Sequence, residues 1–516
     1  MTHDTAALYN AYTSRDPRFD GVFYVGVTST GIYCRPICTA KTPKAANCRF
    51  FDSAEAAEKA NFRPCLRCRP ELAPGNAPVD EAHRIAHLVA QRIDEGMVAP
   101  SRRSGPAPAK REGQAPSQRS SQGQAPPAGL EQIAAQFGWS SRQIRRIVQR
   151  ELGVSPIELV LTRRLLLAKQ LLTETALPIT EVAFASGFSS LRRFNDAFLG
   201  RYGMAPTRFR KSADDVGGAA APGDTLTLQL TYRPPFDWPG LLRFLEARTL
   251  TGVERVVDGA YLRTVELGDR RGWIHVRHRP ERRALQVELT HSLTPVLPAL
   301  LGRLRHLFDL NARPDVIAAH LASDPLLAGA VARGAGLRVP GAFDGFELAV
   351  RAILGQQITV KAATTLAGRF AAALGASVET PHAGLDRLCP SPRRIAATTV
   401  DEIASLGIIQ SRARSIIALA REIASGRLTL AAGAEPERTM AQLVDLPGIG
   451  QWTAHYIAMR ALRWPDAFPK EDVALRKNLG GVTGARAEEL SQPWRPWRSY
   501  ATLYLWQGAV QATRLD

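Results

Sequence analysis

The spacing of apolar residues changes along the chain and separates regions of different secondary structure. Between about residues 130 and 210 the sequence is rich in amphipathic helical segments. Alternating apolar residues begin at Leu226, Leu228 and Leu230 and recur later in the chain, at Trp273, Ile274 and Val276 and at Leu285, Val287 and Leu289. Such alternation is typical of strands with one buried face. From about Pro314 onward the pattern is almost entirely helical, so we expect an α+β part followed by a helical part.

Two segments interrupt these patterns and predict the domain boundaries. Residues 99–129 contain six prolines and no Val, Ile, Leu, Met or aromatic residue, so burial cannot offset the entropy cost of ordering them. We expect a basic, disordered linker there. The second segment, 211–224, is rich in Ala, Gly and Asp and also marks a break. The predicted domains are residues 1–78, 79–212 with the linker inside it, 224–312 and 313–516.

The helix-rich region contains an internal duplication. Residues 133–141 (IAAQFGWSS) resemble residues 182–190 (VAFASGFSS) at an offset of 49, so one helical unit occurs twice. Each copy has a turn glycine, then two serines that can cap a helix, and then a basic helix. This order is typical of helix-turn-helix units, whose second helix enters the DNA major groove. The predicted DNA contacts are Arg142, Arg145, Arg192 and Arg193.

Two points about this duplicated unit stay open. A helix is predicted at 80–95, but the linker separates it from the first copy, so it belongs either to that unit or to the N-terminal domain. The unit itself is either a sequence-specific reader of DNA or a degenerate regulator domain that clamps DNA without specificity.

Four of the six cysteines form two close pairs, Cys34 with Cys38 and Cys65 with Cys68. Two chelating pairs of soft ligands suit tetrahedral Zn²⁺, and in a reducing compartment such pairs indicate a metal rather than disulfides. The alternative role is a purely structural site that staples a domain too small for a large core. Cys48 and Cys389 lack partners at ligand spacing, and we interpret them as ordinary thiols.

The composition narrows the class of partner. The 516-residue chain has 66 Lys and Arg against 48 Asp and Glu, a formal net charge of +18, which points to an anionic partner, most often nucleic acid. An acidic membrane is the competing interpretation. No apolar stretch approaches the roughly 18 residues of a membrane span, and the N-terminus lacks a signal-peptide pattern. We therefore expect a cytoplasmic protein that binds nucleic acid and no membrane.

A glycine hairpin at 446–450 (LPGIG) lies between two predicted helices near the C-terminus. Its glycines, Gly448 and Gly450, expose backbone N–H groups at a helix start, a site suited to a DNA phosphate. Asp472 follows 22 residues after Gly450, and a carboxylate beside a DNA sugar stabilises an oxocarbenium-like transition state. The alternative is that Asp472 and its neighbour Glu471 are solvated surface charges.

The N-terminal motifs resemble a known family. Residues 30–38 (TGIYCRPIC) and 62–68 (FRPCLRC) resemble the zinc domain of the alkylation-response regulator family Ada, over roughly residues 4–72, and the duplicated unit resembles the AraC type. The resemblance implies that Cys34 irreversibly accepts a methyl group from a DNA methylphosphotriester. Four zinc-bound thiolates carry a charge of about −2 and repel ordinary phosphodiesters. Methylation removes one negative charge, so the same resemblance implies a charge switch that strengthens DNA binding.

The C-terminal half resembles a second family, 3-methyladenine DNA glycosylase II, over nearly all of residues 224–510. The likeness rests on 351–356 (RAILGQ), the glycine hairpin, Asp472 and 494–500 (WRPWRSY). It implies that Asp472 is catalytic and that Gln357 contacts the duplex at the wedge position. It further implies a base pocket whose electron-rich rings favour a flipped cationic base, lined by Trp452, Tyr456 and Trp506. Because Trp452 replaces the attacking lysine of lyase-type glycosylases, we expect a monofunctional enzyme that uses water.

Together these observations predict a multidomain, mainly α protein with α+β parts. It joins a small zinc-stapled domain, a double helix-turn-helix, an α+β domain and a helix-hairpin-helix glycosylase domain. We expect it to take up methyl groups stoichiometrically, to bind operator DNA and RNA polymerase as an activator, and to excise 3-methyladenine and 7-methylguanine type bases. The chief rival is a regulator whose inactive glycosylase half serves as a DNA clamp. A zinc-stapled DNA-packaging protein fits the charge but leaves Asp472 unexplained.

Overall fold

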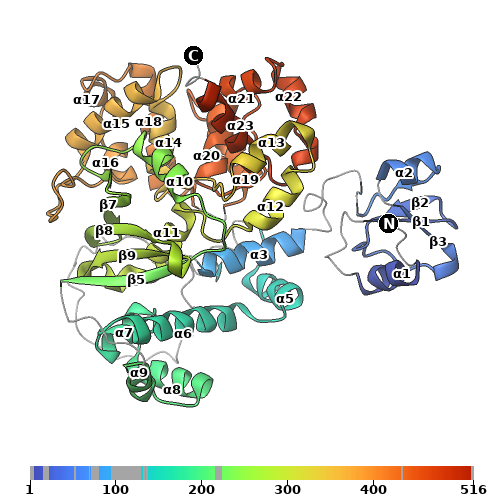
Figure 1. Cartoon of the computed structure of the whole chain (residues 1–516), viewed down its shortest axis with the longest axis horizontal. Helices are drawn as coiled ribbons and strands as arrows, with labels where there is room; N and C mark the ends of the chain where they lie inside the picture. Colours follow the sequence, from blue (N-terminus) through green and yellow to red (C-terminus); the bar gives the residue numbers. More distant parts are fainter. Residues whose placement is uncertain are drawn as a thin grey trace, which may run out of the picture. The chain divides into compact units, whose positions relative to one another are not determined.

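The computed structural model describes residues 5–15, 23–51, 54–68, 70, 81–94, 130–131, 134, 138–214, 224–431 and 434–512. Figure 1 labels the helices and strands of the chain. The chain divides into two compact units. One contains residues up to Ala90 together with Leu130–Glu158, and the other contains the rest. The linker predicted at 99–129 lies outside the described residues. No helix among the described residues is long and apolar enough to cross a membrane.

The N-terminal segment of the first unit is a small sheet with two helices. The strands are β1 (Tyr24–Val27), β2 (Ile32–Cys34), β3 (Cys48–Phe51) and β4 (Arg63–Pro64), in the order β3-β1-β2-β4. Only the β2–β4 pair is parallel. Gly26 is required in β1, because a Cβ there would lie 2.7–3.0 Å from the rings of Phe51 and Phe62. The remaining elements are α1 (Thr5–Ser14), η2 (Ala45–Asn47) and α2 (Ala54–Lys59).

The duplicated helical units have matching local geometry. In the first copy, Gly138 has a φ of 66° and α5 (Ser141–Leu152) begins at a capping box between Ser140 and Gln143. In the second copy, Gly187 has a φ of 86°, and α8 (Leu191–Tyr202) begins after Ser190. Both helices end at a glycine in the left-handed conformation, Gly153 and Gly203, a common way to end a helix. The neighbouring helices are α3 (Glu81–Asp94), α6 (Pro156–Glu174), α7 (Ile179–Ala185) and α9 (Pro206–Asp214).

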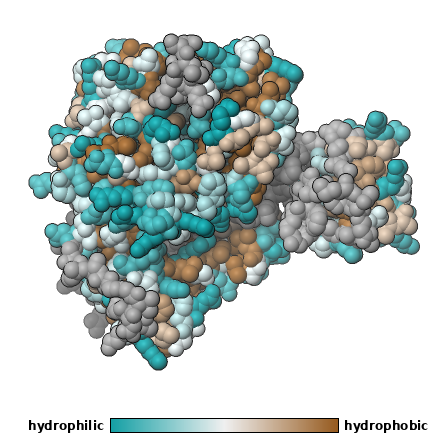
Figure 2. All heavy atoms as spheres, in the orientation of Figure 1, coloured by the Kyte–Doolittle hydropathy of each residue, from teal (hydrophilic) through white to brown (hydrophobic). Residues whose placement is uncertain are grey.

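The alternating segments form a five-stranded antiparallel sheet in the order β5-β9-β8-β7-β6. Leu226, Leu228 and Leu230 of β5 are all buried, so the predicted alternation is confirmed. Figure 2 shows a largely hydrophilic band over these strands. The elements are β5 (Thr225–Thr231), α10 (Trp238–Glu246), β6 (Glu254–Val257), β7 (Ala260–Leu267), β8 (Arg270–Arg279), η4 (Pro280–Arg282), β9 (Ala284–Thr290), η5 (His291–Val296) and α11 (Leu297–Leu307).

The chain is helical from Pro314 onward, as predicted, and one apolar core joins these helices. The two helices of the hairpin are α19 (Pro436–Val444) and α20 (Gln451–Arg460). The others are α12 (Pro314–Leu321), α13 (Pro325–Arg333), α14 (Gly345–Leu354), α15 (Val360–Leu374), α16 (Pro392–Ala396), α17 (Val400–Ala404), α18 (Gln410–Ala424), α21 (Val473–Asn478), α22 (Gly484–Leu490), η6 (Gln492–Trp494) and α23 (Arg498–Ala512).

Candidate metal centre and active site

The four predicted cysteine ligands come together at one end of the small sheet. Cys34 ends β2 and Cys65 follows β4, and the parallel pairing of these strands, with Cys65 N–H donating to Tyr33 O at 3.0 Å, brings the two pairs side by side. All four Sγ atoms are buried and lie within 4.8 Å of one another. Four sulfurs at about 2.3 Å from Zn²⁺ are about 3.8 Å apart, so the cluster fits a tetrahedral zinc.

The surroundings of the cluster explain why it needs a cation. Hydrogen bonding with Cys38 and Cys68, together with burial, raises the pKa of the Cys34 thiol far above its ordinary value. A bound cation reverses this effect and holds the sulfur as a thiolate. Arg35 N–H donates to Cys68 Sγ at 3.4 Å, which orients that sulfur inward.

Burial does not single out a methyl acceptor among the four cysteines. Cys34 and Cys65 are 4% and 8% exposed, and Cys38 and Cys68 are 1% and 0% exposed, so all four are buried residues. Cys48 lies outside the cluster, its thiol donating to Lys44 O, and Cys389 also lies outside it.

The predicted DNA-contacting arginines are exposed at the starts of the two basic helices. Arg142 and Arg145 lie in the first turns of α5, and Arg145 pairs loosely with Glu131 at 3.7 Å. Arg192 and Arg193 lie in the first turn of α8, where Arg192, like Arg142 of α5, is the second residue of its helix. The side chain of Arg192 is 91% exposed and 4.0 Å from Asp196, so it is free to contact a phosphate or a base edge.

The glycine hairpin presents its backbone to solvent around one buried anchor. Gly448 and Gly450 are exposed, while Ile449 between them is 3% exposed. Gly448 has a φ of 77°, and a Cβ there would lie 2.3 Å from Ser415 Oγ on α18. Both the dihedral angle and the close approach therefore require glycine. Gly450 is the N-cap of α20, so the free N–H groups of this helix start face outward.

Asp472 is the N-cap residue of α21, and three donors fix its carboxylate. Oδ1 accepts from Leu475 N–H at 2.8 Å and from Trp506 Nε1–H at 2.9 Å, and Oδ2 accepts from Trp452 Nε1–H at 2.9 Å. The structure thus brings together the predicted carboxylate and two of the three predicted aromatic residues. The neighbouring Glu471 is directed elsewhere: its Oε1 lies against Gly484, and its Oε2 lies 3.7 Å from Arg476.

The third predicted aromatic residue completes a cluster of rings beside Asp472. The rings of Trp452 and Tyr456 stack with centroids 5.4 Å apart and an interplanar angle of 9°, and the Trp506 ring lies 6.4 Å from Tyr456. Trp452 and Tyr456 lie four residues apart on α20, which places them on one helix face. Such a cluster of partly buried rings next to a carboxylate can bind a flat base and act on its sugar.

The loop between α14 and α15 carries the predicted wedge residue and is tied to the hairpin. Gln357 is exposed and has a φ of 56°, a left-handed conformation that a non-glycine residue adopts only where its surroundings hold it. Gln356 holds it: its Nε2 donates to Gly448 O at 2.9 Å and to Thr453 Oγ1 at 3.1 Å, and its carbonyl accepts from Arg412. The bridging role of Gln356 was not predicted from the sequence.

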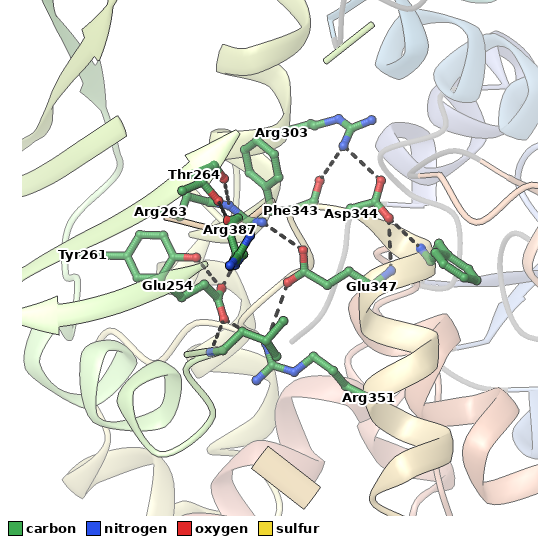
Figure 3. Close-up of polar contacts among 12 residues, drawn as sticks. Glu254, Tyr261, Arg263, Thr264, Arg303, Phe343, Asp344, Glu347, Arg351 and Arg387 are labelled. Atoms are coloured by element: carbon green, nitrogen blue, oxygen red, sulfur yellow. Dashed lines mark hydrogen bonds and ion pairs between the residues drawn. The ribbon is translucent and has the colours of Figure 1, made fainter. Parts of the chain in front are cut away.

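A buried ionic network fixes α14 to the sheet (Figure 3). Arg351 Nη1 pairs with Glu254 Oε2 at 2.9 Å, and Arg263 Nη2 pairs with Glu347 Oε2 at 2.8 Å. Tyr261 Oη donates to Glu254 Oε1 at 2.5 Å. These contacts join β6 and β7 to the helix whose C-terminal end carries the Gln357 loop.

Two further arginines beside Tyr456 were not predicted as site residues, because most of the residues that surround them are distant in sequence. Arg460 Nη1 donates to Tyr456 Oη at 2.6 Å, and the spacing of four residues on α20 was a signal for this contact. The charge of Arg248 also acts on Tyr456, but nothing in the local sequence after α10 indicates that interaction.

Comparison with protein families assigns each part of the chain. Family models match the metal binding domain of Ada at residues 7–71, a helix-turn-helix domain at 133–212, the AlkA N-terminal domain at 227–344, and the HhH-GPD superfamily base excision DNA repair protein at 350–493. With the buried four-cysteine cluster, the Ada match supports Zn²⁺ as the cofactor, and the helix-turn-helix and HhH-GPD matches support DNA as the partner.

The chain is similar to several named bacterial proteins. A probable bifunctional transcriptional activator/DNA repair enzyme AlkA of Mycobacterium tuberculosis is 38% identical over 98% of this chain and 97% of the relative. The DNA-3-methyladenine glycosylase 2 of Escherichia coli is 35% identical over 54% of this chain and 95% of its own length. The bifunctional transcriptional activator/DNA repair enzyme AdaA of Bacillus subtilis is 27% identical over 40% of this chain and 83% of its own length.

Proposed function

Because the chain belongs to the family of bifunctional transcriptional activator/DNA repair enzymes AlkA, we propose that it both excises alkylated bases from DNA and activates repair genes after alkylation. The expected lesions are purines of the 3-methyladenine and 7-methylguanine type. The proposed place of action is the cytoplasm, where bacterial DNA lies.

The observation that carries the glycosylase proposal is the fixed carboxylate of Asp472, held by two indole N–H groups and one backbone N–H. As the bond between base and sugar breaks, positive charge develops on the sugar. A carboxylate that is already oriented stabilises this charge without reorganisation. Water then adds to the sugar, while Trp452, Tyr456 and Trp506 hold the flipped base. A cationic alkylated purine departs as a neutral base and needs no proton donor.

Substitution of Asp472 tests this proposal. Asp472→Asn keeps the shape of the side chain but removes its charge, so single-turnover release of 3-methyladenine should fall roughly 100- to 1,000-fold while DNA binding persists. Glu471→Gln is the matched control because its carboxylate lies against Gly484. Unchanged release in Asp472→Asn, or loss only in Glu471→Gln, contradicts the assignment. A wild-type protein that binds alkylated DNA but releases no base is the inactive clamp.

The same assay tests the proposal that the enzyme is monofunctional. Lyase-type glycosylases form a Schiff base between a lysine and the sugar, and borohydride traps this adduct. With Trp452 at that position, we expect no covalent adduct. A trapped protein–DNA species would show that another amine attacks the sugar.

For the zinc domain we propose that Cys34 is the methyl acceptor and that Cys38, Cys65 and Cys68 complete the metal site. Bound zinc supplies the positive charge that keeps the sulfurs deprotonated. The Cys34 sulfur attacks the methyl carbon of a phosphotriester, the carbon–oxygen bond breaks, and the phosphate leaves as an ordinary diester anion. Mass spectrometry of the wild-type protein after exposure to methylphosphotriester DNA should find the methyl on Cys34. A methyl on another cysteine of the site would reassign the acceptor.

For the regulatory half we propose that Arg142, Arg145, Arg192 and Arg193 contact an operator and that the bound protein engages RNA polymerase. In a purified transcription system, the methylated protein should raise transcript yield from its promoter, and Arg192→Ala should reduce this gain. If the methylated protein binds the operator but does not increase transcription, the proposed contact with RNA polymerase is wrong while the proposed DNA binding stands.

A further inference from the structure

The hydroxyl of Tyr456 lies in an unusual electrostatic setting. Arg460 Nη1 donates to Tyr456 Oη at 2.6 Å, and the positive charge of Arg248 also acts on this tyrosine. The phenol ring stacks on Trp452, whose indole N–H contacts Asp472. The Tyr456 oxygen therefore accepts a hydrogen bond from one guanidinium group and lies in the electrostatic field of a second, in the ring cluster beside the proposed catalytic carboxylate.

Among the described residues, the guanidinium groups of Arg248 and Arg460 have no carboxylate partner, unlike those of the nearby Arg263 and Arg351. Arg263 and Arg351 pair with Glu254 and Glu347 (Figure 3). Within the described parts of the chain, no carboxylate lies within ion-pair distance of Arg248 or Arg460. Arg460 instead donates to the carbonyls of Pro340 and Gly341 at 2.7 and 3.1 Å and is 6% exposed.

Burying a cation without a counter-anion is costly, so such a group needs a compensating role. Arg248 partly offsets this cost by lying over the Phe244 ring at 3.9 Å and by donating to Phe244 O. Both arginines nevertheless leave net positive charge next to the Tyr456 oxygen. A phenol in such a field is a stronger hydrogen-bond donor than a free tyrosine.

The acidity of Tyr456 follows this arrangement. Burial alone would raise the pKa of the hydroxyl, but Arg460 and Arg248, with a smaller contribution from Arg351, lower it below its ordinary value. The carboxylates on the adjacent elements are Glu347 on α14, Glu254 on β6 and Asp472 at the start of α21. Glu347 and Glu254 pair with Arg263 and Arg351, and Asp472 accepts from the indole groups of Trp452 and Trp506. They do not cancel the field of Arg248 and Arg460.

We propose that the Tyr456 hydroxyl, polarised by Arg460 and Arg248, acts as the acid for damaged bases that carry no positive charge. This inference rests on the proposed glycosylase activity. When a neutral base leaves, the electron pair of the broken bond stays on the base nitrogen, which takes the Tyr456 proton. Water adds to the sugar, and the proton it releases restores the phenol. The two guanidinium groups stabilise the phenolate in between. A cationic base needs no such proton.

The test compares a neutral and a cationic lesion in the same duplex, with hypoxanthine and 7-methylguanine as the probes. Tyr456→Phe keeps the stacked ring but removes the hydroxyl. General acid catalysis contributes roughly 100-fold or more, so hypoxanthine release should fall by about that factor while 7-methylguanine release changes far less. Arg248→Met should cause a smaller loss with the same selectivity. Arg303→Met is the matched control, because Arg303 bonds to Asp344 and Phe343 O instead.

The pH dependence provides a second readout that a purely structural role would not move. Because the protonated phenol is the active form, wild-type hypoxanthine release should fall as pH rises through the lowered pKa of Tyr456, and Tyr456→Phe should lack this fall. Equal losses for both lesions in Tyr456→Phe, or a wild-type protein that releases 7-methylguanine but no hypoxanthine, overturns the inference. If the wild-type protein releases neither lesion, the proposed glycosylase function itself fails.

Discussion

At the scale of single residues, the orientation of Asp472 depends on two indole N–H groups that the rings supply in addition to their flat faces. Trp506→Phe keeps an aromatic face but removes one charge-assisted hydrogen bond, worth about 1.5–3 kcal/mol. We expect single-turnover excision to slow by roughly 10-fold or more, with little change in DNA affinity. Trp497→Phe is the control, because that ring packs on Tyr500 instead. If Trp506→Phe lowers DNA affinity but leaves the excision rate unchanged, Trp506 contributes to DNA binding and not to the orientation of Asp472.

A second prediction at this scale concerns Gly448. Gly448→Ala imposes a left-handed conformation on alanine, at about 1–2 kcal/mol, and also displaces the Ser415 hydroxyl, which donates to Ser411 O at 3.0 Å. Gly426→Ala isolates the first effect, because Gly426 has nearly the same φ, 76°, with nothing within 4 Å of its Cβ position. Calorimetry should show the larger destabilisation in Gly448→Ala, and only that variant should lose affinity for DNA. If the two variants lose the same stability and affinity, the close approach to Ser415 is not what requires glycine at position 448.

At the scale of elements, the ionic network between the sheet and α14 determines where the helix carrying the Gln357 loop lies. Glu254→Gln removes one buried charge and leaves Arg351 and Arg263 short of a partner, a change that typically costs about 3–5 kcal/mol. Native-state hydrogen exchange of α14 amides should report this loss. Glu422→Gln is the control, because its pair with Arg427 has a similar distance of 2.7 Å but is exposed. Equal exchange in both variants would mean that the network contributes no stability.

The same network predicts a pH dependence. Burial alone would raise the pKa of Glu254, but Arg351 and Arg263 hold it below its ordinary value. A depressed pKa in the folded state means that the stabilisation is complete above the ordinary carboxylate range and disappears as pH falls through the folded pKa. The difference between wild type and Glu254→Gln should therefore be large at neutral pH and shrink in acid. A constant difference across that range would contradict this assignment.

At the scale of the whole molecule, a net charge of +18 means that DNA binding includes a large salt-dependent contribution. Methylation of the zinc cluster removes one negative charge, so the methylated protein should bind its operator more tightly than the unmethylated protein. The difference should shrink as salt rises, because screening weakens the repulsion it relieves. Fluorescence anisotropy at several ionic strengths measures both forms, and equal affinities at low salt would exclude the charge switch.

The sequence alone determined the features that local motifs encode. Cys34, Cys38, Cys65 and Cys68 were predictable because chelating pairs need short spacings, and the strands at Leu226–Leu230 because one buried face imposes alternation. The left-handed glycines at 138 and 187 followed from the duplication. Trp452 and Tyr456 lie four residues apart on one helix, so their shared face was also predictable.

Only the tertiary structure decided which distant groups meet at the site. The indole bonds to Asp472, the bridge from Gln356 to the hairpin, and the approach of Arg248 to Tyr456 join elements that are far apart along the chain. Local sequence carries no signal for such pairs, because packing of the helices and the sheet sets them. Burial then decides their strength, since a charge or hydrogen bond acts far more strongly away from water.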